Sequence, residues 1–337
     1  MGPRVGTRYL TRLVTQLESN AEDARALHSA LSQLFYLRAV EWRFFVANGG
    51  VEALLDLMRL HDLDAGIQLI CCKCFSQLGS VTHCVYSRIV AERGAVGLLL
   101  CALDNHLQDM TLSYYACLAL SQLAANHAVR VLIAIKGGIE LIVVAMQRHR
   151  HDGLVQAAGC SALAALAEHL PNHAIIEPRM AILFDAAAAH ASSASVAREC
   201  CRACCALSRS RRVQESIGPA GGLHTILNIA RAHLGDASVV ANACTALSTL
   251  AAHPPNAALV GPQGLHVVKS AMNMHPSSAA VQQVGCVLLA QISHFANVHG
   301  EMQIVSSMQL HPANVQLQSI ACGARQQSTS SSRTLTC

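Results

Sequence analysis

The chain is poor in charge and in aromatic side chains, and it contains no long apolar run. Charged residues make up 13% and aromatic residues 4% of its 337 residues. No apolar stretch is long enough to cross a bilayer, and the N-terminus lacks the apolar core of a secretion signal. The net charge of +4 is too small to indicate a nucleic-acid partner on its own. We therefore expect a soluble cytoplasmic protein whose 15 cysteines are mostly reduced thiols.

Catalytic motifs are also missing. The sequence has no Gly-x-x-x-x-Gly-Lys phosphate loop and no Gly-x-Ser-x-Gly nucleophile elbow. The segment from His149 to Asp152 contains the groups of a proton relay, but a solvated turn is the better interpretation, because a catalytic histidine needs a pocket and a nucleophile. We therefore expect a non-enzymatic protein that uses no cofactor and no metal.

What the sequence does contain is one unit repeated many times. Seven histidines are each followed eleven residues later by a cysteine, and successive pairs lie 36 to 45 residues apart. The pairs are His61 and Cys72, His106 and Cys117, His149 and Cys160, His190 and Cys201, His233 and Cys244, His275 and Cys286, and His311 and Cys322. A fixed offset at such a period is typical of a solenoid, in which each unit packs on its neighbours.

Within one unit the apolar residues predict three helices. A break at Gly137-Gly138 precedes an apolar helix that ends near His149, and a second helix is expected over 154–168 because its apolar residues recur at helical spacing. A shorter amphipathic helix is expected over 128–135. The same pattern places the starts of eight repeats near Thr7, Val51, Val96, Ile139, Met180, Leu223, Leu265 and Glu301. The glycine break ahead of Leu265 is expected at Gln263-Gly264.

A three-helix unit of this kind, with a glycine break and a final helix rich in small residues, resembles the armadillo repeat. Its histidine and cysteine columns are also similar to those of armadillo segments in large multidomain proteins such as leucine-rich-repeat kinases. The resemblance implies an all-α fold, a right-handed α-solenoid of about eight armadillo-like repeats. We expect this solenoid to occupy residues 1–325, followed by a disordered Ser- and Thr-rich tail over 326–337.

Both columns have a structural interpretation. Each histidine is expected to close a helix, where its ring can bond free carbonyls. The dense cysteines around Cys71 and Cys200 fall in columns where sister units have small or apolar residues, so we expect them to pack as small hydrophobes. The alternative, a thiol-based metal or redox protein that uses these two clusters, stays open. Cys84, Cys101 and Cys337 lie outside the columns and are the better candidates for reactive thiols.

The armadillo resemblance implies that a partner peptide binds along the concave groove lined by third helices. The family members that import nuclear proteins hold such peptides with ladders of Trp and Asn, and neither ladder is present here, so recognition of basic localisation signals is not expected. Some of these positions have small residues, and others at or beside them have glutamines, a tyrosine, a leucine and cations. The predicted partner-binding residues are Gln33, Lys73, Gln77, Tyr114, Leu118, Gln122, Arg198, Arg202 and Gln291.

These observations favour a protein-binding scaffold or adaptor that holds a partner peptide or helix in the groove. We expect a monomer or a component of a larger complex. One alternative is a structural subunit of a ciliary or cytoskeletal assembly, which would place the protein there rather than in the bulk cytoplasm. The other is the thiol-based protein described above.

Overall fold

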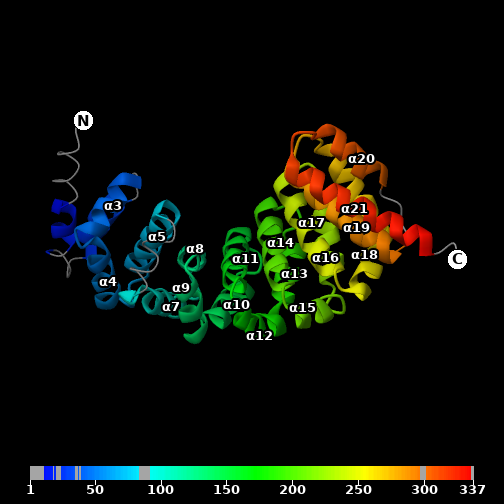
Figure 1. The fold of residues 1–337 in the computed structure, drawn as a ribbon. Coiled ribbons are helices and arrows are strands. Elements are labelled where there is room, and N and C mark those ends of the chain that lie inside the picture. The colour runs from blue at the N-terminus through cyan, green and yellow to red at the C-terminus, as the bar shows by residue number, and fades with distance from the viewer. Residues whose placement is uncertain are drawn as a thin grey trace. The chain divides into compact units, whose positions relative to one another are not determined.

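The computed structural model describes residues 11–17, 19, 24–34, 37, 39–82, 92–296 and 301–334. These residues are predominantly helical and include no strand, which fits an α-solenoid. No helix in this part of the chain combines the length and the apolar character that a membrane span needs. The chain divides into two compact units, Met1–Asn172 and His173–Cys337 (Figure 1).

The helices of each unit follow the order that the repeat predicts. Unit 1 contains α2 (Ala24–Gln33), α3 (Ala39–Ala47), α4 (Gly50–Leu60), α5 (Ala65–Thr82), α7 (Ala95–Asn105), α8 (Met110–Leu123), α9 (His127–Ile135), α10 (Gly138–Arg148), α11 (Gly153–Ala167) and the 3-10 turn η2 (Leu170–Asn172). Unit 2 contains α12 (His173–Ile176), the 3-10 turn η3 (Glu177–Arg179), α13 (Ala181–Ala189), α14 (Ala194–Leu207), α15 (Arg211–Ser216), α16 (Gly222–Ala232), α17 (Ala237–Ala251), α18 (Pro254–Met274), α19 (Ala279–Ala296), α20 (Glu301–Leu310) and α21 (Val315–Thr334).

We call the helix that ends at the column histidine the opening helix, and the helix that carries the column cysteine the third helix. In α2, the third helix of the first repeat, His28 stands at the cysteine position. In unit 1 the third helices α2, α5, α8 and α11 pack in succession, and in unit 2 so do α14, α17, α19 and α21 (Figure 1). Their apolar residues form the core together with the opening helices, and Leu120, Leu163 and Leu247 are completely buried. The division into eight repeats, with the first beginning near Thr7 outside the described residues, remains a prediction.

The column histidines close the opening helices, as the sequence predicts. From α4 to α18 each opening helix has the histidine at its C-cap, where the backbone N–H bonds the carbonyl four residues earlier. The histidine ring does something else: its Nε2 donates to a carbonyl of the preceding repeat, at 2.9 Å in the pair formed by His149 and Leu107. The other such pairs are His106 with Asp62, His233 with Ala191, His275 with Leu234, and His311 with Pro276. The ring therefore joins neighbouring repeats rather than capping its own helix.

Two further kinds of side chain stabilise the turns, one in all seven histidine-containing repeats and one in four of them, and the sequence prediction did not include them. Three residues after the histidine stands an Asp, Ser or Asn that N-caps the third helix, as Asp152 does for α11. Seven residues after the histidine, four repeats carry a glutamine whose Nε2 donates to two carbonyls at the end of the opening helix. In one of them Gln156 bonds Met146 at 2.7 Å and His149 at 3.1 Å. The other three are Gln68, Gln282 and Gln318.

The glycine breaks have the geometry that a helix start needs here. Gly49, Gly94, Gly137 and Gly221 have φ between +75° and +97°, a region that side chains disfavour.

One break lies elsewhere than expected. The sequence pattern pointed to the pair Gln263-Gly264, but the non-helical residue is Gly261, which has φ +27° and kinks α18. Gly264 instead lies in the helix, where a Cβ would come within 2.2 Å of Val260. The smallness of Gly264 therefore serves close packing, and Gly261 supplies the bend.

The last helix, α21, runs from Val315 to Thr334. The Ser- and Thr-rich tail over 326–337 remains a prediction. Cys322 is exposed, whereas the other six column cysteines are buried. The boundary of the solenoid near residue 325 remains a prediction.

Candidate functional site

The face formed by the third helices of unit 1 carries an aromatic and cationic cluster. The Lys73 Nζ on α5 lies 4.8 Å from the centre of the Tyr115 ring on α8, a cation–π contact between neighbouring repeats. Tyr114 and Tyr115 meet edge to face at 4.7 Å. Burial, and next the neighbouring Tyr115, raise the pKa of Tyr114. The sequence analysis predicted Lys73 and Tyr114 as binding residues but did not include Tyr115. In the structure Tyr115 contacts both of them.

The predicted glutamine positions lie on the same face. Gln77 is one turn after Lys73 on α5, and Gln122 is one turn after Leu118 on α8; all four side chains are half-buried. The Gln122 carboxamide has no hydrogen-bond partner among the described residues. On α2, Gln33 donates to the carbonyl of its own helix at Ser29. Two of the three predicted glutamines of unit 1 therefore follow one another on adjacent third helices.

The predicted partner-binding arginines of unit 2, Arg198 and Arg202, which we call the basic spot, are paired with acidic groups of the same unit. Arg202 forms an ion pair with Glu199 on α14. Arg198 lies 3.8 Å from Asp236, the N-cap of the next third helix, α17. The backbone N–H of Val239 lowers the pKa of Asp236, and Arg198 acts in the same direction. A sequence shows the two arginines four residues apart, but only the fold shows which carboxylates reach them.

Two arginines on the next helix of unit 2 are also in contact with carboxylates. Arg212 on α15 lies 2.5 Å from Glu177, and Arg211 lies 3.0 Å from Glu215. On α19 Gln291 is half-buried, and its Oε1 is enclosed without a partner among the described residues. The third-helix face of unit 2 thus combines internally neutralised arginines with a single predicted glutamine.

The cysteine clusters are part of the packed interior. Cys71, Cys72, Cys74, Cys200, Cys201 and Cys204 are buried. Burial raises the pKa of the Cys71 and Cys72 thiols well above the ordinary value, and a hydrogen bond with Cys200, followed by burial, does so for the pKa of Cys204. Within the described residues no three His, Cys, Asp or Glu side chains gather as metal ligands. A protonated, enclosed thiol is a poor nucleophile and a poor metal ligand, so this geometry favours packing.

Two of these thiols have equivalent roles. The Sγ of Cys71 donates to the Leu54 carbonyl and that of Cys200 to the Leu183 carbonyl, each in the opening helix of its own repeat. Of the cysteines outside the columns, Cys101 on α7 is exposed, whereas Cys84 and Cys337 lie outside the described residues.

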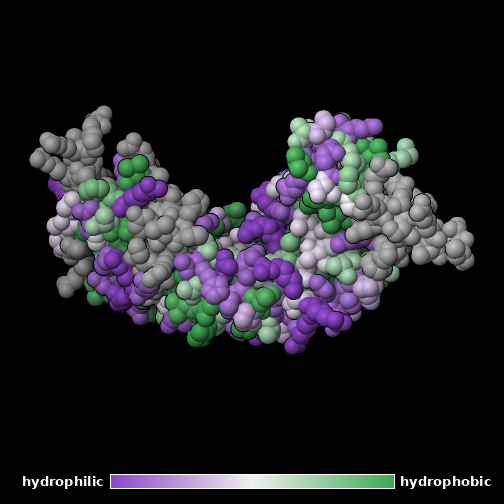
Figure 2. Space-filling view, viewed as in Figure 1, coloured by the Kyte–Doolittle hydropathy of each residue, from purple (hydrophilic) through white to green (hydrophobic). Residues whose placement is uncertain are grey.

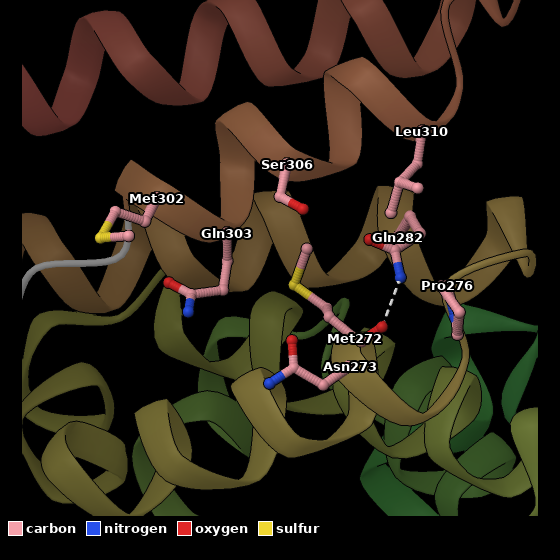
Figure 3. A pocket seen from close by; sticks show the side chains of 8 residues that line it. All are labelled: Met272, Asn273, Pro276, Gln282, Met302, Gln303, Ser306 and Leu310. Atoms are coloured by element: carbon pink, nitrogen blue, oxygen red, sulfur yellow. Dashed lines mark hydrogen bonds between the residues drawn. The ribbon is translucent and has the colours of Figure 1, made fainter.

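Sequence reasoning missed a crevice between two successive opening helices of unit 2. It is lined by Met272, Asn273, Pro276, Gln282, Met302, Gln303, Ser306 and Leu310 (Figure 3). Its floor contains one of the capping glutamines, Gln282, together with Met272. The floor of the crevice could have been predicted from the positions of the glutamine and the methionine relative to the column histidine. The cavity above the floor could not, because it depends on how far apart α18 and α20 lie.

Comparison with known proteins shows the fold and not the family. No protein-family model and no curated protein matches the chain. A chain solved in work on a phosphorylation switch that controls the interaction between cadherin and beta-catenin has a TM-score of 0.58 at 14% identity, over 94% of this chain and 75% of that chain. An engineered protein has a TM-score of 0.47 at 19% identity, over 84% of this chain and 96% of its own. The first likeness is to an armadillo-repeat protein and agrees with an armadillo-like helical fold.

Proposed function

We propose that this protein is a non-enzymatic scaffold or adaptor that binds an extended segment of a protein partner on the third-helix face of unit 1. The observation that carries the proposal is the row of half-buried Lys73, Gln77, Tyr114, Leu118 and Gln122 on two adjacent third helices. The armadillo-like fold supports it, and the structural neighbour comes from work on a protein–protein interaction.

The chemistry of this row suits a peptide backbone with an apolar or acidic side chain. A glutamine carboxamide can donate to a backbone carbonyl and accept from a backbone N–H at the same time, and Gln122 has both groups available among the described residues. Leu118 offers apolar contact and Lys73 offers positive charge. Gln33, Arg198, Arg202 and Gln291 remain proposed contacts on the other third helices.

The proposal is tested by making the same Lys→Glu substitution at two positions, one on the third-helix face of unit 1 and one away from it. Lys73→Glu is compared with Lys136→Glu, which alters an exposed lysine in the turn between α9 and α10. Proteins captured from cell extract by the unaltered chain are identified and then measured against both variants. We expect Lys73→Glu to weaken the affinity for the captured partner by about tenfold, because an interface contact is lost. Lys136→Glu should leave that affinity unchanged.

Equal binding by both variants, in chains whose circular dichroism is unaltered, would contradict the assignment of the face. Loss of binding in both would point to a general effect of net charge. The cytoplasmic location and the alternative of a structural subunit of a ciliary or cytoskeletal assembly stay predictions, to be decided by the identity of the captured partner.

A further inference from the structure

A cavity on the opening-helix side of unit 2 lies outside the third-helix face. We call it the α18/α20 crevice; it encloses about 450 Å³ between the last turn of α18 and the length of α20. This size falls within the range of about 300 to 1,000 Å³ that ligand sites occupy. Hydrophobic and hydrophilic residues lie beside one another on the surface over α20 (Figure 2).

The apolar part of the crevice consists of three flexible side chains and Pro276. Met272 is buried in its floor, while Met302 is 82% exposed and Leu310 54% exposed at its rim. A thioether side chain adapts its shape to an apolar occupant. Covering an exposed methionine removes apolar surface from water, which stabilises the complex. None of the eight residues that line the crevice carries a formal charge. An uncharged lining disfavours a charged occupant, which would lose its hydration without gaining a partner.

The polar part consists of two carboxamides that reach into the crevice from opposite helices. Asn273 comes from α18 and Gln303 from α20 (Figure 3). Neither has a hydrogen-bond partner in the part of the chain that the structure describes. Gln282 differs, because its Nε2 already donates to the Met272 carbonyl at 2.8 Å and to the His275 carbonyl at 3.0 Å.

We propose that the α18/α20 crevice binds an uncharged apolar side chain of a partner polypeptide, while Asn273 and Gln303 hydrogen-bond the amide groups on either side of that residue. Each carboxamide supplies a donor and an acceptor, as the backbone of an extended segment requires. The site is independent of the third-helix face and stands whether or not that face binds a partner.

An equivalent crevice in unit 1 provides an internal comparison. It lies between α4 and α7, encloses about 270 Å³ and also has a methionine and a capping glutamine in its floor, Met58 and Gln68. At the place of Asn273 stands Arg59, which donates to Asp56 at 2.5 Å, and at the place of Pro276 stands Asp62. This crevice is smaller and charged, so it lacks both features on which the proposal rests.

The test uses the full chain with isotope-labelled methionine methyl groups. The probe is N-acetyl-leucine N′-methylamide, which has one apolar side chain between two amide groups, and the charged probes are the corresponding aspartate and lysine compounds. We expect saturable shifts of the Met272 and Met302 methyl signals with the leucine probe, with a dissociation constant of roughly 1 to 10 mM for a ligand of this size. The charged probes should bind at least about fivefold more weakly. The Met58 methyl signal should not shift.

Matched variants locate the binding. Ser306→Trp fills the crevice from an exposed position, and Gln309→Trp adds the same side chain to an exposed position of α20 that does not line it. We expect the first to abolish the leucine-probe shifts and the second to preserve them. Asn273→Asp replaces the donating amide nitrogen with a charged carboxylate oxygen at nearly the same volume, so it should weaken binding of the leucine probe several-fold. This second variant tests the site if Ser306→Trp does not fold. Shifts that do not saturate, equal shifts with charged probes, or binding that survives Ser306→Trp in a folded chain would each overturn the proposal.

Discussion

The third-helix faces of the two units rest on the same frame and differ in their chemistry. Both units use the histidine bond between repeats, as at His149 and His233, and both use the capping glutamine, as at Gln156 and Gln282. On that frame unit 1 presents Lys73 against a tyrosine ring, whereas unit 2 presents arginines that its own carboxylates neutralise. Conserving the frame leaves the exposed positions of each third helix open to different chemistry, which is how one fold can offer distinct binding faces.

The largest effect that we expect is a dependence of stability on pH, which arises from buried column cysteines in both units. Burial raises the pKa of Cys117 in unit 1 and of Cys244 in unit 2 from 9.0 to about 12. Between these values the unfolded chain loses the thiol proton while the folded chain keeps it, so each thiol stabilises the fold fully below pH 9 and progressively less as the pH rises toward 12. The free energy of unfolding should fall by about 1.4 kcal/mol per pH unit per thiol in this range.

Denaturant unfolding at several pH values checks this prediction. Cys117→Ala and Cys244→Ala should each show a shallower decline above pH 9 than the unaltered chain, whatever cavity the smaller side chain leaves, because a cavity shifts stability equally at each pH. If the frame is the same in both units, the two variants will change the slope equally. An unaltered slope would contradict the account of these thiols.

The next effect concerns the capping glutamines. Gln156→Ala and Gln282→Ala each remove a buried side chain that bonds two helix-end carbonyls. The Met146 and Met272 carbonyls then lose this donor beside a cavity, whereas the His149 and His275 carbonyls still accept from the backbone N–H of the residue three positions later. We expect each variant to lower the free energy of unfolding by about 2 to 4 kcal/mol. Gln309→Ala, at an exposed position on α20, is the control. Clearly unequal losses at Gln156 and Gln282 would show that the frame differs between the units.

The weakest effect concerns the face of unit 2. The Arg202 side chain is 45% exposed and paired with Glu199 within one helix turn, so Arg202→Gln should change the free energy of unfolding by less than about 1 kcal/mol. The same variant should weaken binding of the captured partner less than Lys73→Glu does, because Glu199 already pairs with the Arg202 guanidinium. A loss as large as that of Lys73→Glu would mean that the face of unit 2 contributes as much to binding as the face of unit 1.

Much of the local structure could be predicted from the sequence, because it depends on residues that are near one another along the chain. The expected helix over 154–168 is α11, Gly153–Ala167, and the expected short helix over 128–135 is α9, His127–Ile135. The closing histidines follow from the same short-range pattern. The capping glutamines were also within reach: each stands seven residues after a column histidine, with a methionine three residues before that histidine.

The parts that could not be predicted involve contacts between repeats. The ring of His149 bonds the carbonyl of Leu107, 42 residues earlier, and Arg198 approaches Asp236 of the next repeat. A side chain whose partner lies one repeat away is oriented by helix packing, which a sequence pattern does not specify. The basic spot therefore looked free in the sequence and is paired in the fold.

The order of residues is enough to specify the repeating helices, their caps and the buried columns, because helical periodicity, capping residues and small apolar positions act over a few residues. The packing of the helices is needed to specify which charges are neutralised, which carboxamides of the faces keep unused hydrogen-bonding groups, and where a crevice opens between α18 and α20. These features depend on the distance and rotation between packed helices. Small changes in that packing open or close a cavity without altering the pattern of the sequence.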